Sequence, residues 1–175
     1  IRTSLLDARW LRGNKALFDE LITRFQEELI ASSGHKFVEG KLAERDDRHR
    51  RMGDTRYVLE PNLKDGKGGL RDLQTLFWIG KYLYQASNAR DLKNAGILTS
   101  ADEKSFSKAE NFLWTVRCHL HYLAGRSEER LTFNVQEQLG ERMGYKARAG
   151  SSGVERFMKH YFLTAKDVGD LTRVL

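Results

Sequence analysis

Glu60-Pro61-Asn62-Leu63-Lys64-Asp65-Gly66-Lys67-Gly68-Gly69-Leu70-Arg71-Asp72 is the stretch around which this chain is organised. It holds the only proline of the sequence and three of its 15 glycines. Pro61 fixes its own φ and pushes the preceding residue toward an extended conformation. The glycines allow a positive φ, or let another chain or a ligand approach the backbone closely. We therefore expect a tight turn that leads into a helix beginning at about Gly69.

The same stretch carries three cations, Lys64, Lys67 and Arg71, around its glycines. Backbone N–H groups at a helix start, together with the helix dipole, favour an anion. A phosphate or carboxylate cradle is one interpretation. A plain connector is the other, because turn chemistry explains proline and glycine without a ligand. The stretch is neither a Walker A loop nor a dinucleotide-binding fingerprint.

Apolar residues recur at intervals of three and four along most of the chain, which predicts amphipathic helices. After the loop, Leu70, Leu73, Leu76 and Phe77 begin such a stripe, and Trp78 widens it, so this helix is expected to be central and buried. The segment 56–59 is too short to imply a sheet. We predict an all-α fold, an irregular bundle of about six helices with a long glycine-rich loop. The expected helices cover residues 4–11, 14–32, 35–52, 69–87, 99–125, 135–143 and 153 onward.

Helix boundaries follow from capping residues. Asn14, Thr99 or Ser100, Asn134, and Ser152 or Gly153 are the expected starts. The helix that begins at Asn14 is expected to end near Ser32-Ser33-Gly34, and its apolar face to lie in a core or an interface. Gly169 is expected to interrupt the last helix.

Length and charge limit the function classes. With 175 residues, one domain is expected, and no apolar run is long enough to span a membrane. The formal charge of +6 and the pI near 9.5 suggest an anionic partner: a nucleotide, a nucleic acid or an acidic protein surface. The charge could equally balance an acidic neighbouring domain. A single cysteine, Cys118, excludes an internal disulfide and fits a cytoplasmic location.

Residues 61–79 resemble the signature of the PII uridylyltransferase/uridylyl-removing enzyme family, where it lies in a helical domain just after the nucleotidyltransferase core. Residues 5–9, 121–126 and 130–133 also resemble segments of that family. A shorter version of the signature is similar to the glutamine synthetase adenylyltransferases. The longer match, with Asn62 and Trp78, favours the uridylyltransferases.

The resemblance implies that residues 1–175 form a single helical domain, an internal fragment of a larger multidomain nucleotidyltransferase. The family transfers UMP from UTP to the nitrogen-regulatory PII protein, and removes it, in response to nitrogen status. The sequence has no Asp-x-Asp and no His-Asp, the motifs that carry the two activities. We therefore expect no catalytic residue, metal ligand or cofactor in this segment, with Mg²⁺ implied for the intact enzyme. Its expected role is to close the nucleotide/PII cleft beside the adjoining nucleotidyltransferase domain.

Candidate residues near the nucleotide or substrate belong to the loop: Asn62, Lys64, Lys67, Gly68, Gly69, Arg71 and Asp72. Asp72 lies in the first turn of a helix, where the helix dipole stabilises a carboxylate. This capping role is the simpler interpretation of Asp72. Secondary candidates are Arg48, His49 and Arg51, which could line an anion site beside the loop. The family has an Arg-His pair before a Gly-Asp-Thr/Ser turn, as Arg48-His49 precedes residues 53–55 here. A solvated helix face is the competing interpretation.

Three other functions stay open at this point. The first is the equivalent domain of an adenylyltransferase or a related signalling nucleotidyltransferase. The second is a basic helical nucleic-acid-binding module, which only the charge supports, because no helix carries a dense Arg/Lys stripe. The third is a helical bundle that binds other proteins and has no link to catalysis. We expect no membrane partner, and nucleic acid is the weaker alternative.

Overall fold

The computed structural model describes residues 2–174, and the side chains of residues 2–173. The all-α prediction is confirmed: between residues 2 and 174 no strand forms, and only two isolated β-bridges occur. The elements are α1 (Arg2–Leu6), α2 (Lys15–Arg24), a π-helical segment (Phe25–Ile30), α3 (Ala31–Arg51), α4 (Leu70–Tyr84), α5 (Ala89–Asn94), α6 (Ser100–Ala124), α7 (Phe133–Arg142), α8 (Gly153–Leu171) and a short 3₁₀ turn (Thr172–Val174).

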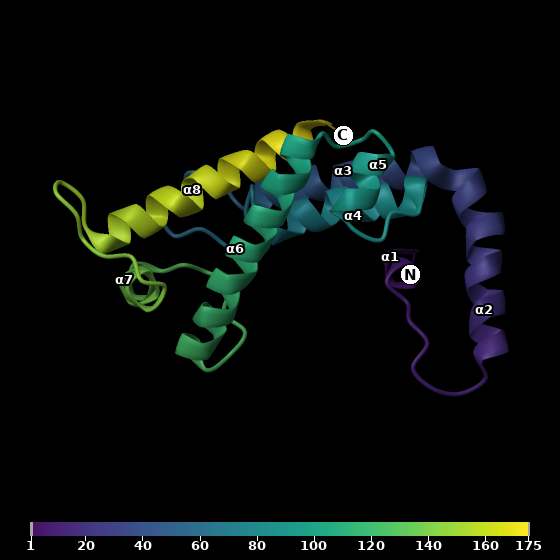
Figure 1. Ribbon diagram of the computed structural model, residues 1–175, viewed down its shortest axis with the longest axis horizontal. Coiled ribbons are helices and arrows are strands. Elements are labelled where there is room, and N and C mark those ends of the chain that lie inside the picture. The colour runs from purple at the N-terminus through teal and green to yellow at the C-terminus, as the bar shows by residue number, and fades with distance from the viewer. Residues whose placement is uncertain (1, 175) are drawn as a thin grey trace.

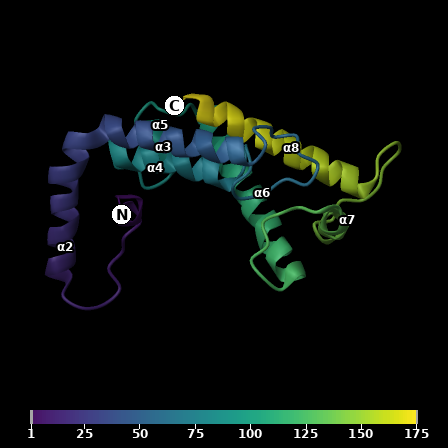
Figure 2. The same cartoon turned by 180° about the vertical axis from the view of Figure 1, so that it is seen from behind.

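The helices form an arch (Figure 1). Helices α3, α4 and α8 form the top of the arch. Helix α2 extends downward at one end, and the C-terminal part of α6 extends downward with α7 at the other. Helices α3 and α4 lie side by side in both views (Figures 1 and 2). The loop between them, residues 52–69, lies against α8 at Gly68.

Helix α4 is the centre of the main core, as the sequence predicts. Leu73 and Leu76 on α4 are 1–2% exposed and pack with Leu113 and Val116 of α6 and Phe157 of α8. This cluster contains most of the fully buried side chains, so α4, α6 and α8 fix one another. A smaller cluster surrounds Tyr82, where α4 meets the first third of the chain.

Helix α2, the π-helical segment and α3 run on as one bent rod. The predicted break at residues 32–34 is a kink inside the rod, at Ser33, whose backbone is non-helical (φ −138°, ψ 20°). The Ser33 hydroxyl hydrogen-bonds the Leu29 carbonyl and lies 2.8 Å from the Tyr82 hydroxyl. Side-chain bonding of this kind within a helix is a recognised cause of bending.

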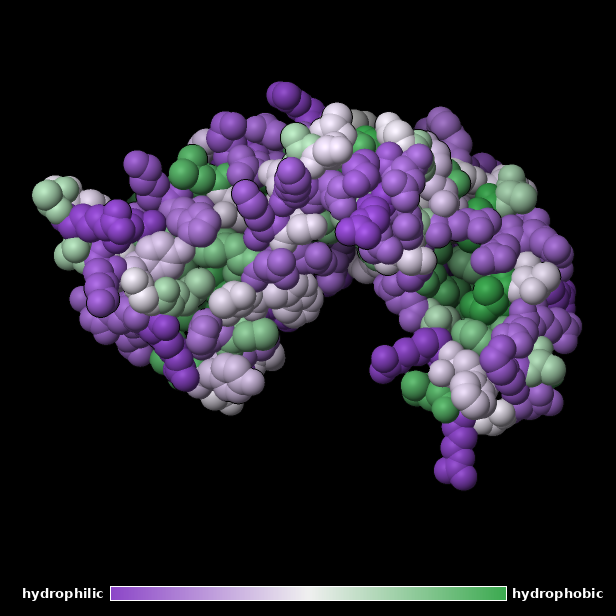
Figure 3. All heavy atoms as spheres, in the orientation of Figure 1, coloured by the Kyte–Doolittle hydropathy of each residue, from purple (hydrophilic) through white to green (hydrophobic). Residues whose placement is uncertain are grey.

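The apolar face of α2 lies at the surface. Leu17 is 64% exposed and Leu21 46%. Figure 3 shows apolar residues on the inner side of the arm that α1 and α2 form. Of the two roles expected for this face, a place in the core is wrong for Leu17 and Leu21. It is right for Phe25, one turn further along, which is 4% exposed and belongs to the cluster around Tyr82.

The predicted caps are largely confirmed. Asn14 caps α2, Thr99 forms a capping box with Asp102, and Ser152 forms one with Glu155. Asn134 was expected to cap α7, but that prediction is wrong: the helix begins two residues earlier than expected, at Phe133, with Thr132 at the cap position.

Two further differences concern α5 and α8. Helix α5 was not expected, since its six residues are too few to show a periodic pattern. Gly169 does not interrupt α8, which runs on to Leu171. A Cβ at this position would lie 2.6 Å from the Arg56 guanidinium, so the glycine makes room for a side chain from the loop.

Gly68 marks the tightest contact between the loop and α8. Its φ is +82°, and a Cβ there would lie 2.4 Å from the backbone oxygen of Ala165. Both the backbone conformation and the space therefore require glycine.

We expect Gly68→Ala to lower the free energy of unfolding by more than about 3 kcal/mol, because strain and overpacking add. Gly96→Ala is the matched control, since Gly96 has a similar φ (+75°) but open space around it. Its cost should be about 1–2 kcal/mol, from the backbone alone. Urea unfolding followed by circular dichroism measures both. Equal losses would show that the contact with α8 does not matter.

Candidate functional site

The loop is anchored to the segment that follows α6. The Leu63 N–H donates to the Glu129 carbonyl (2.8 Å), and the Leu131 N–H donates to the Pro61 carbonyl (2.9 Å). Arg117 of α6 holds Glu129 through a bidentate ion pair of 2.5–3.0 Å. The two segments, nearly 70 residues apart in sequence, therefore form one rigid unit.

The loop then closes on itself. The Asn62 side-chain oxygen accepts from the N–H groups of Lys64 (3.0 Å) and Asp65 (2.7 Å). A Cβ on Gly66 would lie 2.5 Å from the Asn62 carbonyl, and one on Gly69 2.7 Å from that of Leu63. Asn62 and these glycines thus serve close packing of the chain against itself.

Helix α4 begins at Leu70, with Gly69 at the cap position, as predicted. The backbone donors at this start are already used. The N–H groups of Leu70 and Arg71 donate to the carbonyls of Leu63 (3.0 Å) and Lys64 (2.9 Å), and that of Gly69 to Gly66 (2.9 Å). The backbone cradle considered for an external anion is therefore filled by the loop's own carbonyls.

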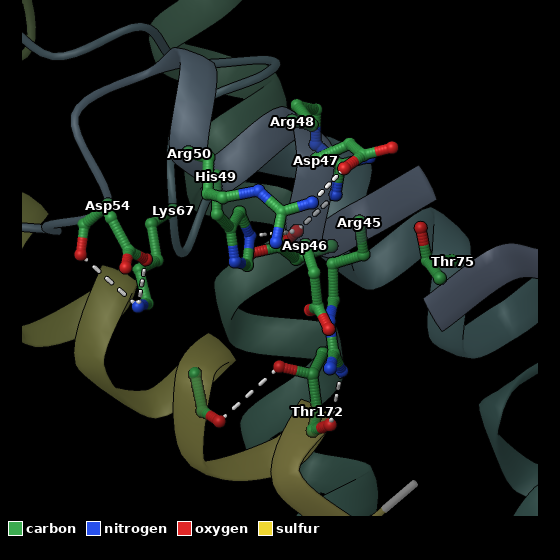
Figure 4. Close-up of polar contacts among 12 residues, drawn as sticks. Arg45, Asp46, Asp47, Arg48, His49, Arg50, Asp54, Lys67, Thr75 and Thr172 are labelled. Carbon is green, nitrogen blue, oxygen red and sulfur yellow. Dashed lines mark hydrogen bonds and ion pairs between the residues drawn. The ribbon is translucent and has the colours of Figure 1, made fainter. Parts of the chain in front are cut away.

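The anion at this helix start is the side chain of Asp72. Its carboxylate is 1% exposed and lies 2.5 Å from Arg48 Nη2 and 2.9 Å from His49 Nε2. It also accepts the Gly68 N–H (2.8 Å). We call Arg48, His49, Gly68 and Asp72 the Asp72 cluster; Figure 4 shows the α3 side of it. It joins α3, the loop and α4 at one buried point.

Burial alone would raise the pKa of the Asp72 carboxyl. Hydrogen bonds from His49 and the Gly68 N–H, with the electrostatic attraction of His49 and Arg48, outweigh burial and lower that pKa below its usual range. Asp72 is therefore ionised at neutral pH. We expect it to contribute more to the stability of the fold than an exposed carboxylate at a helix N-terminus does.

Arg48 and His49 were predicted to line an anion site. Both are buried, at 9% and 8% exposure, and the anion that they contact is Asp72. The third secondary candidate, Arg51, is exposed at the end of α3. Charge runs do not reveal such a division, because the sequence of 44–51 does not show which cation turns inward.

The three loop cations have different surroundings. Lys67 pairs with Asp54 (2.8 Å), which lowers the pKa of that carboxyl (Figure 4). Arg71 lies 3.5 Å from an Asp65 oxygen and over the Trp78 ring. Lys64 makes no ion pair within residues 2–173. The loop therefore keeps positive charge that internal pairs do not neutralise.

A hollow of about 260 Å³ opens beside the loop. We call it the loop hollow. Of the predicted site residues, Arg51, Asn62 and Lys67 line it. The lining residues that sequence reasoning missed include Arg56, Glu60, Arg130 and Tyr161. In the sequence, Arg130 stood out only as part of the segment 130–133 that resembles the family. No sequence pattern pointed to Arg56, because its position depends on the space at Gly169. Arg71 lines another hollow, with Arg48, Arg51 and Trp78.

Between residues 2 and 173, no three His, Cys, Asp or Glu side chains gather in a way that could hold a metal ion. None of the described helices is long and apolar enough to cross a membrane.

Asp72→Asn should cost about 3–5 kcal/mol of unfolding free energy at neutral pH, because it leaves the Arg48 charge buried without its partner. Asp72 has a lowered pKa in the folded state, so its stabilisation is present above the ordinary aspartate pKa and is lost as the pH falls through the folded value. The difference in unfolding free energy between the unmodified protein and Asp72→Asn should therefore become smaller in acid.

The control is Asp19→Asn, which breaks an exposed pair with Lys15 on α2 and should cost less than about 1 kcal/mol. Urea unfolding across a pH series measures all three proteins. An Asp72→Asn protein as stable as the control at neutral pH contradicts the role given to the cluster.

Known proteins resemble this chain over nearly its whole length. The family described as GlnD PII-uridylyltransferase matches residues 36–175. Two relatives named bifunctional uridylyltransferase/uridylyl-removing enzyme, from Azospirillum brasilense and Rhodospirillum rubrum, are 62% and 60% identical over 174 residues. These matches cover 99% of this chain and 19% of each relative. No solved structure matches. The chain belongs to the GlnD PII-uridylyltransferase family.

Proposed function

We propose that this chain is the helical, non-catalytic part of an enzyme that transfers UMP from UTP to a PII regulatory protein and removes it again. The support is membership of the family together with a match to only 19% of the relatives' length. The enzyme would act in the cytoplasm in response to nitrogen status. This family match favours a uridylyltransferase over the related adenylyltransferases.

We place the role of this segment at one wall of the cleft that receives UTP and PII. One observation carries this: the Asp72 cluster fixes the glycine-rich loop rigidly while Lys64, Lys67 and Arg71 stay partly exposed on it. Charges held on a rigid support lose little freedom when they bind. Each charge-assisted contact to a phosphate or a carboxylate would contribute about 1.5–3 kcal/mol.

Mg²⁺ in the intact enzyme is part of this proposal, since it neutralises triphosphate charge in nucleotidyl transfer. The described residues do not fit a Mg²⁺ site. Their one deeply buried carboxylate, Asp72, is already occupied by Arg48, His49 and a backbone N–H. The metal-holding acids would therefore belong to another part of the enzyme, and no step is assigned to the metal here.

The test is the double variant Lys64→Ala/Arg71→Ala in the complete enzyme that contains this segment. We expect KM for UTP or for PII to rise, or kcat to fall, by at least about tenfold, from the loss of one charge-assisted contact. Steady-state uridylylation of PII measures each constant.

The control is Arg90→Ala/Lys104→Ala, which removes two exposed cations from α5 and α6. It should leave all three constants unchanged. Constants that are equally unchanged in the loop variant would exclude the loop from the cleft.

A further inference from the structure

The loop hollow gathers cations from three separate segments. Arg51 comes from the end of α3, Arg56 and Lys67 from the α3–α4 loop, and Arg130 from the segment after α6. One carboxylate, Glu60, shares the lining. Charges of one sign brought together from distant parts of a chain repel one another, so an anionic occupant would relieve a cost that the fold otherwise carries.

The guanidinium groups around the hollow are weakly paired. Arg130 Nη2 is 3.4 Å from a Glu60 oxygen, and its side chain is 60% exposed. Arg51 Nε reaches the Asp47 carbonyl only at 3.4 Å, and Arg56 Nη1 reaches the Lys166 carbonyl at 3.3 Å. Each arginine has five N–H donors, so most of these donors stay available. Lys67 is the exception, because Asp54 holds it at 2.8 Å.

Tyr161 provides a second, independent observation. Its side chain lines the hollow and is 1% exposed, and its hydroxyl makes no hydrogen bond with any of residues 2–173. Burial, with the nearby Asp72 charge, raises the Tyr161 pKa well above its usual value. The phenol therefore stays protonated and has an O–H to donate. A donor without a protein partner, on a nearly buried side chain in the wall of a cationic hollow, points to an acceptor that binds in that hollow.

We propose that the loop hollow is a binding site for a phosphate group, held by Arg51, Arg56 and Arg130 with the Tyr161 hydroxyl. Arginine matches phosphate oxygens in geometry as well as charge, and donors that arrive from several sides suit a tetrahedral anion. A hollow of about 260 Å³ is smaller than the usual range for whole small-molecule ligands, about 300–1,000 Å³. It therefore fits phosphate or pyrophosphate better than a complete nucleotide.

The site does not depend on the proposed function, because binding can be measured without any transfer reaction. It also differs from two of the three loop cations assigned to the cleft, because Arg71 lies in another hollow and Lys64 lines neither. The third, Lys67, lines the loop hollow but is paired with Asp54. The phosphate could be free inorganic phosphate or pyrophosphate, or one end of a nucleotide that extends outward.

Isothermal titration of the 175-residue chain with pyrophosphate, with phosphate and with UTP tests the site. Tyr161→Phe removes one hydroxyl and no internal hydrogen bond, so it should weaken pyrophosphate binding about tenfold, the value of one hydrogen bond to a charged group. Arg130→Gln, at an exposed side chain, should weaken it at least as much. Arg126→Gln is the control, since Arg126 lies on the same segment, is 75% exposed and pairs outside the hollow with Glu128.

Saturable pyrophosphate binding that falls in the first two variants, but not in the third, supports the site. UTP that binds with the same dependence on Tyr161 and Arg130 assigns the phosphate to a nucleotide. UTP that does not bind assigns it to the free anion. Absence of saturable binding of all three ligands overturns the proposal. So does an equal loss in Arg126→Gln, because net charge alone would then explain the binding. If Tyr161→Phe unfolds at a clearly lower temperature, the comparison of Arg130→Gln with Arg126→Gln tests the site.

Discussion

One buried carboxylate joins α3, the glycine-rich loop and α4. Asp72 accepts hydrogen bonds from Arg48 and His49 of α3 and from the Gly68 N–H of the loop, while its own backbone lies in the first turn of α4. Removing any one partner leaves the others buried and unsatisfied, which costs far more than a surface ion pair contributes. The position of the glycine-rich loop therefore depends on this cluster.

Packing around the cluster explains the composition of the loop. Gly68 lies against the backbone of α8 at a positive φ, and the segment 61–63 pairs with residues 129–131. The glycines serve contacts between parts of the chain, and the cations remain at the rim. In the function that we propose, the side chains on this loop would bind the ligand, and the packed backbone would hold them in place.

The longer helices, most of their caps and the central position of α4 could be predicted from the sequence, because periodicity and capping are local. It did not reveal which of the cations at 48–51 turn inward, since that depends on where α4 lies. The hollow was missed for the same reason: Arg56 needs the space at Gly169, and Arg130 reaches the loop only through pairing of residues far apart in sequence. The backbone N–H groups at the start of α4 were predicted to bind a ligand, but they donate to carbonyls of the loop itself.

Native-state hydrogen exchange at the amides of Gly68, Leu70 and Arg71 tests the central claim most directly. If the cluster makes the loop part of the core, these amides exchange only when the whole protein unfolds, with the same protection as the amide of Leu113 in α6. Exchange through local fluctuations, at a free energy several kcal/mol lower than that of Leu113, would contradict the account, because the loop would then move independently of the helices that Asp72 joins.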